Sequence, residues 1–443
     1  MPLALTAFNI LHKANMVAHY ETENDFVEDS LIYFDNDDCV FCGMLAKQCY
    51  LDAARSGATR PPIQNLKTFF VRGGASLRIH DDFFPASEAL TAQDVLSIYL
   101  AYLFRLTKDY LGSRPGQEPL DLDAVVRKFS LPACIEDRYR DEVKSMIVGA
   151  IAKAYCLEKW LKDELVKGVP LFRLREALTE ATLLARTIQD DLSAPAMTEA
   201  TAAGYNRILA SVSEPKPPLS LLVVNVGAGF TDFALLTASR GTNGNGANGS
   251  PVTLLARGGV STGASVWDTT VRTLIFNKLK VSNGARRSNE FKIFKSRIEM
   301  ELRGLKEKLI AAPDAVEVDA SPFVLDSVRL TREELETSLP VKAALFTIRD
   351  GLRTYLKQAV RAAGIECFDP AVTEILVTGG GSFIPAVVEC IRESASVLGP
   401  AFASKVRADY VSPFYASIPN IAHVYPLSPW PSVPRKKSNL SSR

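Results

Sequence analysis

Two glycine-rich segments are the residues of this 443-residue chain whose types and spacing best suit a chemical role. The first, Val226–Thr231, lies between two apolar runs, and the second, Thr378–Pro385, separates an apolar run from a helical pattern. Bare glycine backbone approaches an anion closely and can turn several N–H groups toward it. Where such a loop opens a helix, the positive end of the helix adds to the attraction. Both segments therefore indicate binding of phosphate groups.

Neither glycine segment identifies a nucleotide site when it is taken alone. The two segments match neither the P-loop pattern G-x4-G-K-[ST] nor the dinucleotide pattern G-x-G-x2-G. A tight structural turn explains each group of glycines equally well. The interpretation therefore depends on the order of the two segments and on the elements around them.

Apolar runs and helical periodicity predict the elements that position the two loops. Strands are expected over Leu219–Val226, Thr231–Ala238, Val252–Ala256 and Val372–Thr378, the middle two forming a hairpin with a long tip. Residues up to about Phe70 are expected to alternate short strands with polar breaks. Helices are expected at Leu90–Tyr110, Arg140–Lys167, Leu171–Leu192, Thr198–Val212, Phe291–Ile310, from a capping box at Thr331 and Glu334, from about Pro340 to Gly364, and at Ile384–Leu398.

The order of these segments resembles the actin-like ATPase superfamily and, within it, the nucleotide-binding domain of the heat shock protein 70 chaperones. Asn225–Asp232 is similar to the family's second phosphate motif, and Leu376–Pro385 is similar to its adenosine motif. Further segments follow the family's order between about Leu31 and Ile391. They are Asn65–Lys67 (catalytic lysine), Met197–Ala203 (connecting helix), Gly258–Gly259 with Gly263–Asp268, Leu305–Leu309 (adenosine helix) and Leu330–Leu335.

The resemblance implies an α/β protein with the actin-like ATPase fold, in which duplicated ribonuclease H-like lobes surround a nucleotide cleft. Lobe I with a helical insertion would be residues 1–212, and lobe II with a helical insertion and the adenosine-binding motif would be 213–398. Residues 399–425 would return to lobe I, and 426–443 would be a flexible tail. The Pro-rich stretch 214–218 marks the boundary between the lobes.

The resemblance also implies ATP and Mg²⁺ as cofactors and attack of water on the γ-phosphate. Lys67 would position this phosphate, while Glu199 and Asp232 would order magnesium-bound water, with no residue assigned as a direct metal ligand. The residues that would hold the nucleotide are Asn225, Gly227, Ala228, Gly229, Thr231, Gly263, Ala264, Lys306, Gly379, Gly380, Gly381 and Ser382.

Departures from the family pattern predict a degenerate site. No glycine precedes Gly43, so the first phosphate loop is missing or rebuilt, and Asn9 stands where the first strand should carry aspartate. Asn225 replaces an aspartate in the same way, and an amide holds magnesium and its waters less firmly than a carboxylate does. The adenosine helix also departs from the family at Arg303, Glu307 and Ile310.

The leading prediction is a stand-alone ATP-binding protein, similar to heat shock protein 70, with weak or absent hydrolysis and a chaperone-related or regulatory role. No peptide-binding β-domain is expected, because no apolar linker follows Leu398. The alternatives are a nucleotide-independent pseudo-ATPase scaffold and an actin-like filament-forming protein. A sugar or acetate kinase ranks last, since no acidic base stands in a convincing motif.

Composition and charge exclude other classes. Lys and Arg number 51 against 50 Asp and Glu, so no net field attracts nucleic acid or anionic lipid. No apolar run reaches the roughly 18 residues of a membrane helix, and the start lacks the positive region of a signal peptide. Seven cysteines, with no zinc partners for Cys39 and Cys42, indicate reduced thiols and a cytoplasmic protein. The expected partners are ATP or ADP and unidentified proteins.

Overall fold

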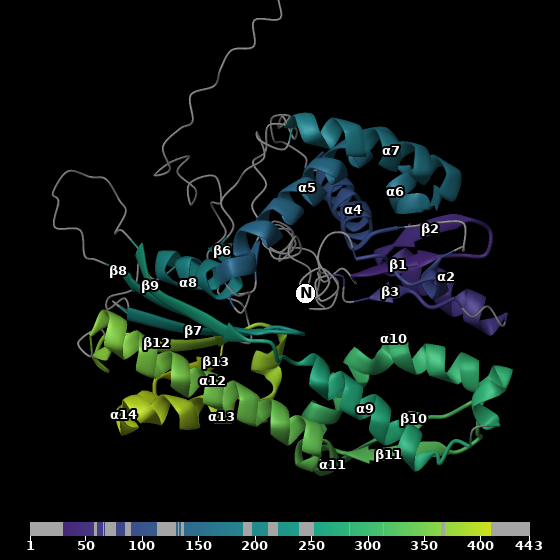
Figure 1. The fold of residues 1–443 in the computed structure, drawn as a ribbon. Helices are drawn as coiled ribbons and strands as arrows, with labels where there is room; N and C mark the ends of the chain where they lie inside the picture. The colour runs from purple at the N-terminus through teal and green to yellow at the C-terminus, as the bar shows by residue number, and fades with distance from the viewer. Residues whose placement is uncertain are drawn as a thin grey trace, which may run out of the picture.

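The computed structural model describes residues 30–56, 60–64, 66, 77–84, 90–112, 130–131, 133, 137–188, 197–210, 220–238, 252–282, 284–312, 314–364 and 368–408. Within them the chain is a mixed α/β protein (Figure 1), which confirms the sequence prediction at that level. Several predicted features lie outside the described residues. These are Lys67, the strand placed around Asn9, the Pro-rich stretch 214–218 and everything after residue 408.

The first sheet is antiparallel and has the order β3-β1-β2-β5. Its strands are β1 (Leu31–Phe34), β2 (Cys39–Cys42), β3 (Ile63–Gln64) and β5 (Val169–Pro170). Helix α2 (Gly43–Arg55) follows β2 without a break, so the expectation of strands up to Phe70 is wrong here. Its buried residues recur at helical spacing and cover the sheet: Gly43, Ala46, Tyr50 and Ala54.

A helical unit packs against the first sheet and shares one apolar core with it. It contains α4 (Ala92–Gly112), α5 (Asp137–Leu161), α6 (Glu164–Lys167) and α7 (Leu171–Ile188). The helix predicted over Arg140–Lys167 is interrupted because Lys162 adopts a left-handed backbone with φ of 45°. Beside this unit, β4 (Ser130–Leu131) and β6 (Met197–Thr198) form a short parallel pair.

The second sheet has five strands in the order β13-β12-β7-β8-β9. Strands β7 (Ser220–Val226), β8 (Thr231–Ala238) and β9 (Val252–Val260) pair antiparallel with one another in that order, as the hairpin prediction for β8 and β9 requires. Strands β12 (Thr373–Thr378) and β13 (Val406–Ala408) run parallel to β7. Every residue of β7 is buried, which is typical of a strand covered on both faces.

Helices cover both faces of the second sheet (Figure 1). Alternate residues of β7 separate the two faces: Leu221 and Val223 pack toward α8 (Glu199–Ala210), while Leu222 and Val224 pack in the other core. That core includes α12 (Leu339–Ala363) and α13 (Pro385–Ala395). Gly364 ends α12 at the predicted residue.

A smaller unit adjoins the second sheet. It consists of α9 (Ser265–Lys278), α10 (Asn289–Ala311), the hairpin of β10 (Ala315–Asp319) with β11 (Ser327–Thr331), and α11 (Arg332–Thr337). The predicted capping box is confirmed, because the Thr331 and Glu334 side chains each accept the other residue's backbone N–H. Helix α10 also contacts α2, where the Tyr50 hydroxyl donates to Ser296 Oγ at 2.8 Å.

Candidate functional site

The two glycine loops touch each other. Strands β7 and β12 end side by side, with Asn225 paired to Thr378, so both loops leave the same edge of the second sheet. Gly379 has φ of 83°, and a Cβ there would lie 2.6 Å from both Asn225 Oδ1 and the Val226 carbonyl oxygen. A Cβ on Gly381 would collide with the Val226 side chain. Only glycine permits this approach of the two backbones.

The first loop is bound to the start of α9. The backbone N–H of Ala264 donates to the carbonyl of Gly227, and that of Ser265 donates to the carbonyl of Ala228, each at 2.8 Å. Gly263 makes this possible, because a Cβ there would lie 2.5 Å from the Gly227 carbonyl oxygen. The carbonyls of Gly227 and Ala228 therefore each accept a hydrogen bond from the start of α9.

The amides of the first loop are the groups that remain for an anion. Gly227 donates its N–H to the carbonyl of Phe230 at 2.9 Å, which closes the turn. In the described part of the chain, the N–H groups of Ala228 and Gly229 donate to no backbone acceptor. Thr231 is fully buried and donates its hydroxyl to the carbonyl of Thr262 at 2.8 Å, so it holds the loop in shape.

Glu199 lies beside this loop at the first position of α8, where the positive end of the helix favours a carboxylate. Its Oε2 accepts a hydrogen bond from Asn225 Nδ2 at 2.9 Å. The same oxygen would be 3.8 Å from a Cβ on Gly227. The structure thus brings Glu199 and Asn225 together beside the first glycine loop.

Asp232 is placed differently from a water-ordering carboxylate. It faces Asn225 across the β7–β8 ladder, but its side chain is buried. Its Oδ1 accepts the backbone N–H of Ala133 at 2.8 Å, a residue of the preceding unit. A buried carboxylate bonded in this way ties two parts of the chain together.

The second loop forms a single 3₁₀ turn over Gly380–Phe383 before α13 begins at Pro385. Ser382 is buried and donates both its N–H and its hydroxyl to the carbonyl of Gly379, at 3.0 and 2.7 Å. Its role in the structure is to hold the turn. A Cβ on Gly380 would meet no atom within 4 Å, so this glycine borders open space.

Lys306 forms an ion pair with Asp268 of α9. Its Nζ lies 2.8 Å from Asp268 Oδ1, and both side chains are largely buried. Sequence reasoning did not select Asp268, although it ends the stretch Gly263–Asp268 that carries part of the resemblance. Arg303 and Glu307 form an exposed pair of their own, with Arg303 Nε 2.9 Å from Glu307 Oε1.

The donor set suits phosphate better than magnesium. Mg²⁺ in proteins takes one or two carboxylates together with substrate oxygens and water. Glu199 and Asp232 are the nearby carboxylates, and each already accepts a protein N–H. Among the described residues, no group of three or more His, Cys, Asp or Glu side chains is arranged to hold a metal ion.

The sequence was compared with protein-family profiles and with curated proteins. No protein-family profile matches the chain, and no curated protein sequence matches it. Across the described ranges, no helix is both long and apolar enough to cross a membrane.

Proposed function

We propose that the chain is a stand-alone ATP-binding protein of the actin-like ATPase fold, similar to the nucleotide-binding domain of heat shock protein 70, with weak or absent hydrolysis. The observation that carries the proposal is the contact between the two glycine loops, which come from distant parts of the sequence. In open α/β sheets, ligands bind outside the carboxyl ends of parallel strands. Strands β7 and β12 are parallel and end at these loops.

The order of the second sheet supports the fold. Three antiparallel strands, β7 to β9, continue into two parallel strands, β12 and β13. This is the arrangement expected of one ribonuclease H-like lobe. In such a lobe, the glycine loops would lie at the edge that faces the nucleotide.

The phosphates would be bound by backbone rather than by side chains. The N–H groups of Ala228 and Gly229 donate to no backbone acceptor in the described chain, and Gly380 borders open space on the loop that touches this one at Asn225 and Val226. Backbone amides of this kind form anion-binding concavities. Mg²⁺, when bound, would supply positive charge against the phosphate oxygens.

Weak hydrolysis follows from the partners of the acidic groups. Asn225 places an amide hydrogen, not a second carboxylate, against Glu199. Asp232 accepts the Ala133 N–H with its Oδ1. The amide of Asn225 adds no negative charge beside Glu199, so this edge would hold magnesium and its waters less firmly than a pair of carboxylates would.

Calorimetric titration with ATP, with and without Mg²⁺, tests the proposal. We expect saturable binding to the native chain and at least tenfold weaker binding to Gly380→Val, because the added side chain enters the open space at the second loop. Gly284→Val is the matched control, since Gly284 is exposed just before the 3₁₀ turn η5 (Ala285–Arg287) and only Ser282 Oγ lies near its Cβ, at 4.0 Å. Absence of heat at millimolar ATP would leave a pseudo-ATPase scaffold as the function.

The proposal extends to a chaperone-related or regulatory role in the cytoplasm, with protein partners that bind one nucleotide state. Capture of partners from lysate in ATP and in ADP, compared with Gly380→Val, tests this part. Partners that bind equally in all conditions would argue against nucleotide control.

A further inference from the structure

The connection between α9 and α10, with the first turns of α10, carries a local excess of positive charge. From Lys278 to Arg297 the chain has one acidic residue, Glu290, against seven basic residues: Lys278, Lys280, Arg286, Arg287, Lys292, Lys295 and Arg297. The balance of the whole chain, 51 basic against 50 acidic residues, conceals this excess. The absence of a net field that attracts anionic lipid is therefore a property of the whole chain and not of this segment.

Five of these cations have no acidic partner. Lys278 Nζ lies 2.6 Å from Glu334 Oε1. Arg297 Nη1 lies 2.9 Å from Asp319 Oδ2. The backbone N–H and hydroxyl of Ser321, with Arg297, lower the pKa of Asp319 to about 2, so this pair stays ionised at neutral pH. The other five are exposed, and within the part of the chain that the structure describes none of them forms an ion pair. We call these five residues the basic cluster: Lys280, Arg286, Arg287, Lys292 and Lys295.

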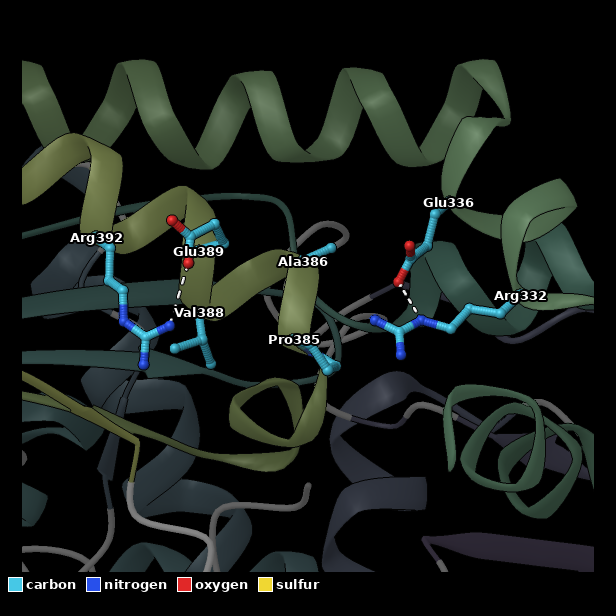
Figure 2. A pocket seen from close by; sticks show the side chains of 7 residues that line it. All are labelled: Arg332, Glu336, Pro385, Ala386, Val388, Glu389 and Arg392. Atoms are coloured by element: carbon cyan, nitrogen blue, oxygen red, sulfur yellow. Dashed lines mark hydrogen bonds and ion pairs between the residues drawn. The ribbon is translucent and has the colours of Figure 1, made fainter. Parts of the chain in front are cut away.

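The pocket between α11 and α13 shows the contrast (Figure 2). Its Arg332 Nε lies 2.7 Å from Glu336 Oε1, and its Arg392 Nη1 lies 3.1 Å from Glu389 Oε2. Each arginine of that pocket is neutralised by a glutamate of the same lining, so the pocket has no excess charge to attract an anion. The basic cluster keeps its charge.

An apolar projection lies beside the basic cluster. We call Val324–Asp326, in the turn between β10 and β11, the hairpin tip. Its Leu325 is 98% exposed, the largest value for any large apolar side chain that the structure describes, and Val324 is 36% exposed. A single exposed leucine is ordinary on a protein surface. Its position next to five unpaired cations is the feature that points to a partner.

Aromatic packing fixes the hairpin tip in this position. Phe323, directly before the tip, has its ring centroid 5.1 Å from that of Phe291 and 6.1 Å from that of Phe294. Phe291 is the third residue of α10, and η5, which contains Arg286 and Arg287, ends directly before this helix. The tip is therefore preordered beside the basic cluster.

This end of the smaller unit is remote from the glycine loops (Figure 1). Helix α9 begins at the first glycine loop, and there its Asp268 pairs with Lys306, near the end of α10. The connection between the two helices lies at their other end. Helix α9 has 14 residues and so spans roughly 20 Å. A partner at the basic cluster leaves the glycine loops accessible.

An aliphatic tip with cations around it suits an anionic bilayer. Apolar side chains enter the boundary between headgroups and acyl chains, and Lys and Arg are attracted to anionic headgroups. Only Glu290 and Asp326 oppose the five cations in these two segments. A nucleic acid would use aromatic faces for its bases. The four phenylalanines here pack on one another instead: Phe276, Phe291, Phe294 and Phe323.

We propose that this end of the smaller unit binds the surface of a bilayer that contains anionic lipid. Leu325 and Val324 enter the interfacial layer, and the basic cluster contacts the headgroups. The preordered tip loses little conformational entropy on binding. One weak anchor gives only marginal association with a membrane, so binding needs both the tip and the cations and is reversible. This inference does not rest on nucleotide binding.

Flotation of the full chain with vesicles, without nucleotide, tests the proposal. The native chain is expected to bind vesicles of equal parts phosphatidylserine and phosphatidylcholine, and not vesicles of phosphatidylcholine alone. Molar salt should release it, because the Debye length falls to about 3 Å there.

Two variants separate the apolar contribution from the ionic one. Leu325→Ser is expected to weaken vesicle binding about tenfold, because the tip no longer enters the apolar layer. Arg286→Ala combined with Arg287→Ala should weaken it roughly 25-fold, about fivefold for each cation. All three side chains are exposed, so these variants fold as the native chain does.

Matched controls remove the same groups elsewhere. Leu183→Ser changes a leucine that is 57% exposed on α7. Lys357→Ala combined with Arg361→Ala removes two exposed cations of α12 and alters the net charge by the same amount. Both controls should bind vesicles as the native chain does.

Leu325→Trp reports the depth of the tip. Its fluorescence is expected to shift to the blue on anionic vesicles and to be quenched by brominated acyl chains, whereas that of Leu183→Trp should do neither. A native chain that does not bind anionic vesicles overturns the proposal. Binding that Leu325→Ser leaves unchanged also overturns it, because the basic cluster would then be a site for polyanions in general, nucleic acid among them.

Discussion

At the scale of single residues, Asn225 gives the Glu199 carboxylate a hydrogen-bond donor from the protein itself. Its amide donates to Glu199 at 2.9 Å, in a position where the proposed resemblance to the actin-like family would put an aspartate. A carboxylate there would stand against Glu199 without a hydrogen to share, unless a proton or a cation came between them. The hydrogen bond therefore performs a task that a metal ion would otherwise perform.

Asn225→Asp is expected to make stability depend on Mg²⁺. Glu199 raises the pKa of the new carboxyl in the folded state, so the variant is least affected at low pH and loses stability as pH rises. The loss is about 1.4 kcal/mol for each unit of that shift. Thermal melts at pH 5 and pH 8, in chelator and in millimolar Mg²⁺, measure it. We expect Mg²⁺ to restore the melting temperature at pH 8.

Asn225→Ala is the control, because it removes the same hydrogen bond without adding charge. Its melting temperature should respond to neither pH nor Mg²⁺ beyond the native response. Two further results would contradict the interpretation. One is an Asn225→Asp variant indifferent to Mg²⁺, and the other is substantial Mg²⁺-dependent ATP turnover that the substitution leaves unchanged.

At the scale of elements, the packing of α12 on β9 depends on a glycine in mid-helix. A Cβ on Gly351 would collide with the Val260 side chain, and Gly258 of β9 meets the Tyr355 ring in the same manner. Glycine within a helix costs about 0.5–1 kcal/mol relative to alanine. Gly351 nevertheless lies within α12 because any larger side chain there would keep the helix from packing this closely on β9.

Gly351→Ala is expected to destabilise the protein by about 1–3 kcal/mol, since overpacking outweighs the gain in helix propensity. Gly304→Ala provides the contrast, because a Cβ there meets nothing within 4 Å, and it should stabilise α10 by about 0.5–1 kcal/mol. Midpoints of urea unfolding measure both effects. Adding Val260→Ala should recover part of the loss in Gly351→Ala. Equal midpoints for the two alanine variants would show that α12 can move away from β9.

Elements with one dominant pattern were predictable from sequence, and elements shaped by tertiary contacts were not. The apolar runs predict β7 and β8 almost to the residue, and the Thr331–Glu334 box predicts the start of α11. Helix α9 was not predicted from the sequence, because its threonines are weak helix formers. Packing of its buried Trp267, Val271 and Ile275 side chains stabilises the helix instead.

The candidate site divides in the same way. Glycine spacing predicts both loops, because the need for bare backbone is local. The bonds from Ala133 to Asp232 and from Lys306 to Asp268 join separate elements, so only the fold brings the partners together. Charge and residue type indicate that such side chains need partners without indicating which ones.

At the scale of the whole molecule, the contacts that join the N-terminal units to the C-terminal ones within the described residues include two that lie far apart. One is the Ala133–Asp232 hydrogen bond at the second sheet. The other lies between α2 and α10, where Tyr50 and Met300 share a buried cluster with Leu31 and Tyr33 of β1. Burial raises the pKa of Tyr50, so its hydroxyl stays protonated at neutral pH. The phenol therefore acts as a donor to Ser296 at 2.8 Å.

Tyr50→Ala is expected to separate α2 from α10 without unfolding the second sheet. Loss of the ring leaves a cavity in the cluster, and such truncations of buried aromatics cost about 3–5 kcal/mol. Tyr50→Phe keeps the ring and loses only the hydrogen bond, about 0.5–1.5 kcal/mol. Amide hydrogen exchange measures the difference: it should accelerate in both α2 and α10 of Tyr50→Ala, slightly in Tyr50→Phe, and not in β7. Gln48→Ala, at an exposed position of α2, should change nothing. Faster exchange in α2 alone would mean that contacts within its own unit hold α10 in place without α2.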